Sequence, residues 1–208
     1  LLLIIGFVFY KGLMPFATEG YSFIDFIFGT EWLPSSKEFG IGAMIVTSMV
    51  ATVGALIIGV PIGILAAIFI AEICPKKYAR VISTAVELLA GIPSVLYGIF
   101  GLAVIVPAIQ TVLSLPKGQS LLAVIIVLSI MMLPTIISLS ETSIRAVPKA
   151  YKEGSLALGA SKIETIFKVT VPAAKSGILA GVILGIGRAL GETMAVILVA
   201  GNSTAMPT

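Results

Sequence analysis

Long apolar segments separated by shorter polar ones dominate this chain of 208 residues. After an apolar start at residues 1–10, four longer apolar segments cover residues 41–71, 81–109, 121–140 and 177–200. Each of the four is long enough for a tilted helix that crosses a bilayer, since each residue adds about 1.5 Å. Their apolar residues follow one another without the alternation that marks a membrane β-strand. The pattern therefore predicts an all-α integral membrane protein with a single transmembrane domain over residues 1–208.

The two ends of the chain predict an incomplete set of spans. Residues 1–10 fall short of the roughly 20 residues that a spanning helix needs, so we expect them to be part of a first span whose start is missing. They begin at Leu1 without a methionine or a basic leader, which disfavours a signal peptide. The polar tail after Ala200 has no further apolar segment behind it.

Residues 91–93, Gly-Ile-Pro, interrupt the apolar segment 81–109. Within lipid, backbone groups freed by such a break must be satisfied by other protein groups or by water in a cavity. The break therefore indicates either an unwound stretch beside a pathway or a packing kink in an ordinary bundle. A kink is the commoner of the two, because proline is frequent in transmembrane helices.

Composition agrees with a membrane protein and excludes several kinds of site. Hydrophobic residues make up 58% of the chain and charged residues 11%, whereas a soluble domain carries about 25% charged residues. The net charge of +3 does not indicate nucleic-acid binding, because membrane proteins collect basic residues in cytoplasmic loops. With one cysteine, Cys74, and no histidine, the chain has no intrachain disulfide, His/Cys metal site or Ser-His-Asp triad.

Basic residues are distributed unequally between alternate loops, which predicts the orientation of the chain. Loops 72–80 and 141–176 carry nine of them: Lys76, Lys77, Arg80, Arg145, Lys149, Lys152, Lys162, Lys168 and Lys175. The other loops carry three: Lys11, Lys37 and Lys117. The first set is therefore expected in the cytoplasm. The external segment 11–40 then holds acidic residues such as Glu19 and Glu31, together with aromatic residues such as Trp32 that suit a membrane interface.

The cytoplasmic loop 141–176 is expected to fold into two short helices joined by a tight bend. Pro148 suits the first turn of a helix, and Gly159 is a typical residue at a helix C-terminus. Ser161 then begins the second helix, with Glu164 three residues later in the spacing of a capping box. Such a bend presents backbone and small side chains to a groove on a partner. The alternative is an amphipathic loop that lies on anionic lipid.

Two charges, Arg188 and Glu192, lie within the last apolar segment. An arginine near the centre of a span costs about 2.5–3.5 kcal/mol on insertion scales, so it is expected to serve a function. Gly177, Gly181 and Gly185 precede the pair at spacings of 4, 4, 3 and 4, and a continuous helix would place all five residues on one stripe. The glycines would let a neighbouring helix approach closely, and the charges would then face the bundle.

These charges predict a pathway for an anion. Glu192 is expected to neutralise Arg188 while the pathway is empty, and an incoming anion to compete for the guanidinium, whose planar fork suits phosphate oxygens. Glu87, at or just inside the boundary of another span, is a third candidate that can pair with Arg188 or with a basic residue of a partner. The alternative for all three is that they lock helices together without touching a substrate.

The cytoplasmic loop resembles the EAA loop of ABC-importer permeases, in which a glutamate, a glycine six residues on and a later Val/Leu-Pro pair mark the contact with the ATPase. Glu153, Gly159 and the pair Val171-Pro172 hold these positions here, while Gly154 and Ser155 replace the usual two alanines. Two further segments, 87–98 and 187–196, add to this resemblance, and the second of them reads Gly-Arg-Ala-Leu-Gly-Glu-Thr-Met-Ala-Val. With the loop, they make the chain resemble the permeases of phosphate-specific (Pst) ABC importers over nearly its whole length. The Met-Ala-Val continuation and the Gly-Thr-Glu-Trp at residues 29–32 favour the C-type subunit.

This resemblance implies a type I importer permease, a helix bundle of six spans of which the chain represents about five. It also implies a heterodimer with a second permease subunit, two cytoplasmic ATPase subunits below, and a periplasmic or lipid-anchored phosphate-binding protein above. The assembly would lie in the cytoplasmic (inner) membrane of a bacterium or archaeon, in contact with lipid and without nucleic acid. No cofactor is expected on this chain, which lacks a Gly-rich phosphate-binding loop, so ATP would bind the partner ATPase.

The same resemblance assigns roles to particular residues. Arg188 and Glu192 match the family's intramembrane pair linked to translocation, and Glu87 lies in a matching segment. The coupling segment corresponds to Glu153, Gly154, Ser155, Leu158, Gly159 and Ala160. By this interpretation the chain is a transport subunit and not itself an enzyme.

Three other functions remain open from the sequence. A permease for another oxyanion, such as sulfate or molybdate, would share the EAA-like loop, and the Arg-Ala-Leu-Gly-Glu-Thr motif is what favours phosphate. A passive anion channel would need no loop for an ATPase. An intramembrane enzyme would find acid/base groups in Glu87 and Glu192 but no nucleophile or metal site beside them.

Overall fold

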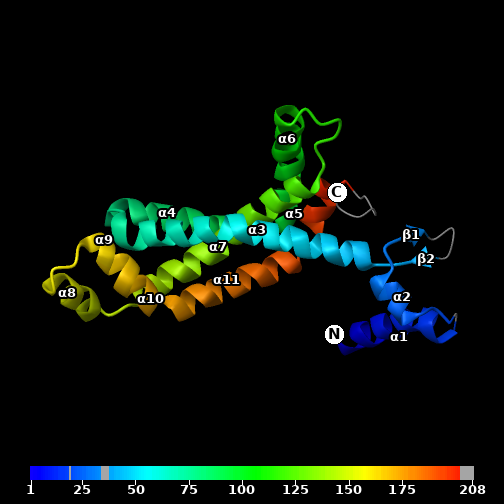
Figure 1. Cartoon of the computed structure of the whole chain (residues 1–208), viewed down its shortest axis with the longest axis horizontal. Coiled ribbons are helices and arrows are strands. Elements are labelled where there is room, and N and C mark those ends of the chain that lie inside the picture. Colours follow the sequence, from blue (N-terminus) through cyan, green and yellow to red (C-terminus); the bar gives the residue numbers. More distant parts are fainter. Residues whose placement is uncertain (19, 34–37, 202–208) are drawn as a thin grey trace. The chain divides into compact units, whose positions relative to one another are not determined.

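A computed structural model of the chain describes residues 1–18, 20–33 and 38–201, in two compact units that comprise residues 1–50 and 51–201 (Figure 1). Glu19 and Lys37, which entered the charge pattern of the external segment, lie outside the described residues, as does the tail 202–208.

The first unit contains the aromatic residues of segment 11–40. It holds α1 (Leu2–Thr18), α2 (Phe23–Phe28), the short strands β1 (Trp32–Leu33) and β2 (Glu38–Phe39), and the first residues of α3 (Gly42–Ile68). The Ser22 hydroxyl caps α2 by accepting from the Asp25 N–H at 3.3 Å. The two strands pair antiparallel with Trp32 opposite Phe39, whose rings meet edge to face at 5.5 Å. Helix α1 continues through Pro15, well past the apolar residues 1–10.

The second unit contains the longest apolar helices. Within the described residues, three helical segments are long and apolar enough to cross a membrane. They are α3 with the π-helical segment η2 (Phe69–Ile73), the run of α5 (Ser94–Phe100), η3 (Gly101–Ile105) and α6 (Val106–Val112), and α7 (Leu121–Arg145). A fourth span is formed if α11 (Lys175–Leu190) is joined to the helical stretch before it, from which it is bent by 69°.

Two of the expected spans are interrupted in the structure. The segment 81–109 is divided between α4 (Lys76–Ala90) and α5, and the segment 177–200 between α11 and α12 (Met194–Ala200). The first break lies at residues 91–93, where Pro93 has no N–H to continue a helix and its ring disfavours helical geometry in the residue before it. The expected segments 41–71 and 121–140 correspond to α3 with η2 and to α7, which continues five residues further to Arg145.

Helix α7 forms the centre of the core of the second unit. Its Met132 and Ile136 are fully buried, at 0% exposure. A Cβ added at Gly63 of α3 would lie 2.8 Å from Ile136, and one added at Gly185 of α11 would lie 3.1 Å from the same side chain. Glycines therefore let both α3 and α11 approach α7 closely, and a larger residue at these positions would push the helices apart.

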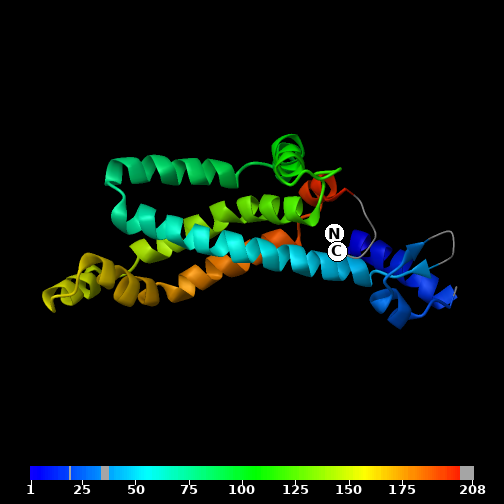
Figure 2. The ribbon, with the colours of Figure 1, turned by 45° about the horizontal axis from the view of Figure 1, so that its top comes forward.

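The polar connection between α7 and α11 is helical almost throughout. It consists of α8 (Lys149–Ala157), α9 (Lys162–Thr165), the π-helical segment η4 (Ile166–Thr170) and α10 (Val171–Ala173). Figures 1 and 2 show α8 and α9 at the end of the second unit where α3 turns into α4. The two loops rich in basic residues thus lie at one end of the helices.

Candidate functional site

The bend between α8 and α9 is closed by a Schellman motif around Gly159. The Gly159 N–H donates to the Leu156 carbonyl at 3.0 Å, and the Ala160 N–H donates to the Ser155 carbonyl at 3.2 Å. Gly159 itself has a φ of +87°, which glycine adopts without strain and which other L-residues rarely adopt. The structure confirms a helix that follows Pro148 and ends at this glycine.

The second helix of the bend begins with the expected capping box. The Ser161 hydroxyl accepts from the Glu164 N–H at 3.2 Å, while the Glu164 carboxylate accepts from the Ser161 N–H at 3.0 Å. The bond from the Ser161 N–H to the carboxylate, followed by donation from the Ser161 hydroxyl to the same carboxylate at 3.0 Å, holds the pKa of Glu164 below its usual value, with a further contribution from Lys168. The bend is therefore fixed at both of its helix ends by local bonds.

The bend exposes apolar side chains at one end of the second unit. Leu158 is 90% exposed, and Tyr151 and Ile163 are more than half exposed. Of the residues assigned to the coupling segment, Glu153, Gly154, Leu158 and Gly159 are exposed and Ser155 and Ala160 are half-buried. The Ser155 hydroxyl lies 2.9 Å from that of Thr165 and so joins α8 to α9. Gly154 lies in open space, because a Cβ there would meet no other atom within 4 Å.

Polar contacts that the sequence analysis did not identify attach this loop to the helices. Lys152 of α8 forms an ion pair with Glu72 of η2. These two residues lie 80 positions apart, so no local pattern connects them. Glu141 and Arg145 form a second pair at the end of α7, with 2.9 Å between Arg145 Nε and Glu141 Oε1. Their spacing of four residues at the end of an apolar helix was a pattern that could have identified this pair.

The intramembrane charges differ from the expected arrangement. Arg188 lies in the last turn of α11, and its guanidinium donates to the Thr135 hydroxyl of α7 at 3.5 Å. Glu192 lies beyond the helix end, and its carboxylate accepts from the Ala195 N–H of α12 at 2.9 Å. The prediction of one continuous stripe that includes Glu192 is wrong, because the helix ends at Leu190 and Gly191 is its C-cap.

The break between α11 and α12 nevertheless places both charges where helix dipoles stabilise them. Arg188 stands at the C-terminal end of α11, where the helix dipole favours a cation, and Glu192 precedes the first turn of α12, where the dipole favours an anion. Ion pairs among the described residues join Arg145 to Glu141, Lys152 to Glu72 and Lys168 to Glu164, so neither Arg188 nor Glu192 is in one. The Arg188 guanidinium has that single long hydrogen bond within the described residues.

The three predicted packing glycines all face α7. A Cβ at Gly177 would collide with the Ser143 side chain, one at Gly181 would lie 3.2 Å from Leu139, and one at Gly185 would lie 3.1 Å from Ile136. Gly187 faces elsewhere, since a Cβ there would meet no atom within 4 Å. The face of α11 that carries these glycines thus positions Arg188 beside α7.

Glu87 is apart from these contacts. It lies one turn before the end of α4, is exposed, and is in none of the ion pairs of the described residues. Nearby Tyr97 of α5 is buried and donates its hydroxyl to the Leu89 carbonyl at 2.8 Å, so it fastens the two sides of the break at residues 91–93.

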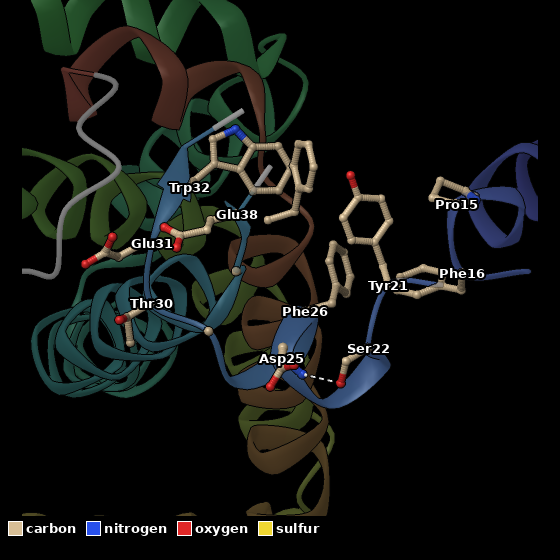
Figure 3. A pocket seen from close by; sticks show the side chains of 14 residues that line it. Pro15, Phe16, Tyr21, Ser22, Asp25, Phe26, Thr30, Glu31, Trp32 and Glu38 are labelled. Carbon is tan, nitrogen blue, oxygen red and sulfur yellow. Dashed lines mark hydrogen bonds between the residues drawn. The ribbon is translucent and has the colours of Figure 1, made fainter. Parts of the chain in front are cut away.

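A pocket of about 900 Å³ lies in the first unit. Its lining combines aromatic rings from α1, α2 and the hairpin with three carboxylates (Figure 3). The lining residues with aromatic or acidic side chains are Phe16, Tyr21, Asp25, Phe26, Glu31, Trp32, Glu38 and Phe39. The first unit therefore offers a concave, acidic and aromatic surface.

Comparison with known proteins agrees with the fold. Residues 59–208 match the profile of the binding-protein-dependent transport system inner membrane component family. A solved structure of the MetNI methionine ABC transporter in inward-facing conformations shares the fold, with a TM-score of 0.56 and 22% identity. That match covers 81% of this chain and 74% of the solved one. The predicted fold class, a type I ABC permease helix bundle, is confirmed.

Similar sequences are permeases. A probable ABC transporter permease of Bacillus subtilis, YqgH, is 45% identical over 95% of this chain and 64% of its own length. The phosphate transport system permease proteins PstC of Mesorhizobium japonicum and Pasteurella multocida are 39% and 36% identical, over 90% and 92% of this chain. The chain spans 62–65% of the length of these three relatives. It belongs to the family of binding-protein-dependent transport system inner membrane components, as a multi-pass membrane protein similar to PstC.

Proposed function

We propose that this chain is the membrane-spanning part of a permease subunit in an ATP-driven phosphate importer. The observation that carries the proposal is the capped α8–α9 bend, which exposes Leu158 at 90% on the side of the basic loops in a chain similar to phosphate permeases. Apolar side chains on a capped cytoplasmic bend suit a groove on a protein better than water. A passive channel has no need of such a contact.

The proposed partners follow from the two ends of the second unit and from the family. A second permease subunit would pair with the helices in the bilayer. Two ATPase subunits would bind ATP and would receive the bend that contains Glu153 and Gly159. A phosphate-binding protein, periplasmic or lipid-anchored, would deliver the ion from the outer side. ATP-driven closure of the ATPases would displace the bend and rock the helices to change access to the pathway.

Arg188 is the proposed contact for the anion. Its guanidinium has five donors, of which the structure engages one in a long bond to Thr135, so the others are available to phosphate oxygens. A free arginine offsets part of the cost of removing an anion from water. Glu192 would compete for the guanidinium only after it leaves the Ala195 N–H, so the proposed release role includes opening of that cap.

Radiolabelled phosphate uptake tests this proposal in bacteria that lack their own high-affinity permease and carry the completed gene with its partner genes. We expect uptake that excess sulfate leaves unchanged and that Arg188→Gln lowers about tenfold or more, since a hydrogen bond to a charged group contributes about 1.5–3 kcal/mol. Thr135→Val is the matched control, because it removes the structural hydrogen bond and leaves the charge.

The outcomes separate the alternatives. Equal losses in Arg188→Gln and Thr135→Val would reduce Arg188 to a structural contact. Uptake that sulfate or molybdate abolishes would assign the chain to another oxyanion. Phosphate uptake that persists without the ATPase genes would indicate a passive channel.

A further inference from the structure

The polar connection between α7 and α11, which contains the proposed ATPase contact, is called the docking loop below. The π-helical segment η2, at the end of α3, receives one contact from α8, within this loop, and one from α7, the helix that precedes it. Lys152 of α8 pairs with Glu72, and Arg145 of α7 donates from its second terminal nitrogen to the Ile70 carbonyl at 3.1 Å. Both contacts are partly buried. They place η2 between the surface on which a partner would dock and the longest apolar helix of the chain.

The sequence explains why η2 accepts a side chain from another helix. In this segment hydrogen bonds run from residue i+5 to residue i, as the Cys74 N–H shows by donating to the Phe69 carbonyl at 2.8 Å. The next donor in that series would be residue 75, which is proline and has no N–H. The Ile70 carbonyl is left without it, and Arg145 supplies a donor instead.

Among the ion pairs of the described residues, the pair of Lys152 and Glu72 joins two elements that are distant in sequence. Each of the other two pairs links residues four positions apart on one stretch of helix. The Glu72 side chain is 12% exposed and that of Lys152 is 24% exposed. An ion pair with so little solvent is poorly screened by salt, and loss of one partner leaves a charge in a partly buried place. Ion pairs between exposed side chains contribute about 0–1 kcal/mol to stability, so the low exposure of this pair distinguishes it from a surface pair.

The second pair extends the connection to α4. Glu141 is 8% exposed and accepts from Arg145 Nε at 2.9 Å and from the Ser83 hydroxyl at 2.8 Å. Ser83 lies on α4, so one carboxylate and one guanidinium hold together α7, α4 and η2. Two cations, Lys152 and Arg145, thereby fasten the docking loop and the end of α7 to the same five-residue segment.

We propose that η2 is the receiver of the docking loop: Lys152, through Glu72, transmits displacement of α8 to α3, and Arg145 with Glu141 and Ser83 keeps α4 and α7 moving with it. This inference rests on the proposed function in that a partner displaces α8. Lys152, Glu72, Arg145 and Glu141 are positioning residues, because none of them is proposed to touch phosphate or ATP. Their role is to fix how much span movement follows each ATP cycle.

The test measures phosphate imported per ATP hydrolysed by the full complex in proteoliposomes. Lys152→Glu and Glu72→Lys each place like charges together, and we expect each to lower the ratio about tenfold, within the usual range for coupling between sites. The double variant with the charges exchanged restores the pair and is expected to recover most of the ratio. Lys175→Ala is the control, since Lys175 is exposed and in none of the ion pairs of the described residues.

A second readout does not depend on the transported ion. Spin labels at two exposed positions, Phe69 of η2 and Leu184 of α11, in a Cys74→Ser background, report the movement of α3 relative to α11. We expect ATP to shift their distance in the otherwise unchanged complex, and Lys152→Ala to abolish most of the shift while the ATPase still co-purifies.

Each outcome decides one question. Equal ratios and equal shifts in the wild type and in the Lys152 and Glu72 variants would overturn the role of η2, as would a charge exchange that recovers nothing. A wild-type complex can also import no phosphate and still show an ATP-dependent shift of the spin-label distance that requires Lys152. That result would refute the proposed substrate and support the proposed role of η2.

Discussion

Gly159 determines the conformation of the bend between α8 and α9, called the docking bend below, through one backbone angle. Its φ of +87° costs other L-residues about 1–2 kcal/mol, while asparagine tolerates this region better than alanine does. Open space surrounds the position, so a substitution there changes the backbone preference without a steric clash inside the chain. A substitution at Gly159 therefore tests the effect of backbone conformation on the bend separately from the effect of side-chain packing.

We expect Gly159→Ala to speed amide hydrogen exchange in residues 149–165 about tenfold and to reduce the ATPase that co-purifies, because the Schellman bonds are lost together. Gly159→Asn should have a smaller effect. Gly154→Ala is the matched control: Gly154 is helical and a Cβ there meets nothing within 4 Å, so exchange should stay the same or slow. Unchanged exchange in Gly159→Ala would contradict the prediction.

Glu192 permits a separation of its charge from its hydrogen bond. Glutamine keeps an oxygen that accepts from the Ala195 N–H, whereas alanine removes it. If the charge competes with phosphate at Arg188, Glu192→Gln and Glu192→Ala both impair uptake. If Glu192 only caps α12, uptake falls in Glu192→Ala alone, with a loss of stability of about 0.5–2 kcal/mol. Uptake and thermal unfolding of the purified complex together distinguish the two roles.

The difference between the expected and observed Glu192 shows what residue spacing can establish. The spacing of Gly177, Gly181 and Gly185 predicted a face that packs on a neighbouring helix, and such spacing is informative as long as the helix continues. At Gly191 the helix ends, and spacing carries no information across that residue. An acidic residue just before the first turn of a helix is favoured by the helix dipole, and the long apolar segment obscured the helix start that this residue marks.

At the scale of elements, the glycine face of α11 determines how closely that helix approaches α7. Gly185→Val would insert a branched side chain against Ile136, because even its Cβ would lie 3.1 Å from that side chain, while a valine at Gly187 would face open space on the same helix. Both changes have the same cost in helix propensity, so their difference measures packing. We expect Gly185→Val to be less stable than Gly187→Val by about 1–3 kcal/mol, read as a lower Tm of the purified complex. Equal Tm values would show that α11 and α7 are not closely packed there.

Elements with local determinants were predictable and those fixed by distant contacts were not. Pro148, Gly159, Ser161 and Glu164 predicted α8 and α9 because each acts on backbone groups within a few residues. Hydropathy predicted the positions of α3 and α7 but joined α4 and α5 into one span. The break between them, at residues 91–93, was indicated instead by the glycine and the proline there. The ion pair between Lys152 and Glu72 depends on how α8 folds back on η2, which no window of sequence contains.

In the second unit, the basic loops and the docking bend lie together at one end of the helices. The loop between α6 and α7 lies at the other end (Figure 2). This arrangement agrees with the excess of Lys and Arg in loops 72–80 and 141–176, because it places the bend on the same side of the membrane as both of these loops. The proposed function requires that side to be the cytoplasm, because ATP and the ATPases are there.

Cysteine labelling tests this orientation in a Cys74→Ser background of the completed protein. Leu158→Cys places a thiol on the docking bend and Leu113→Cys places one beyond α6; both positions are exposed, at 90% and 51%. A membrane-impermeant thiol reagent should label Leu113→Cys in intact cells and Leu158→Cys only after the inner membrane is opened. Bound ATPase should then protect Leu158→Cys and leave Leu113→Cys unprotected. Labelling of Leu158→Cys from outside would invert the chain and exclude an ATPase contact at the bend, because a docking surface outside the cytoplasm cannot receive energy from ATP.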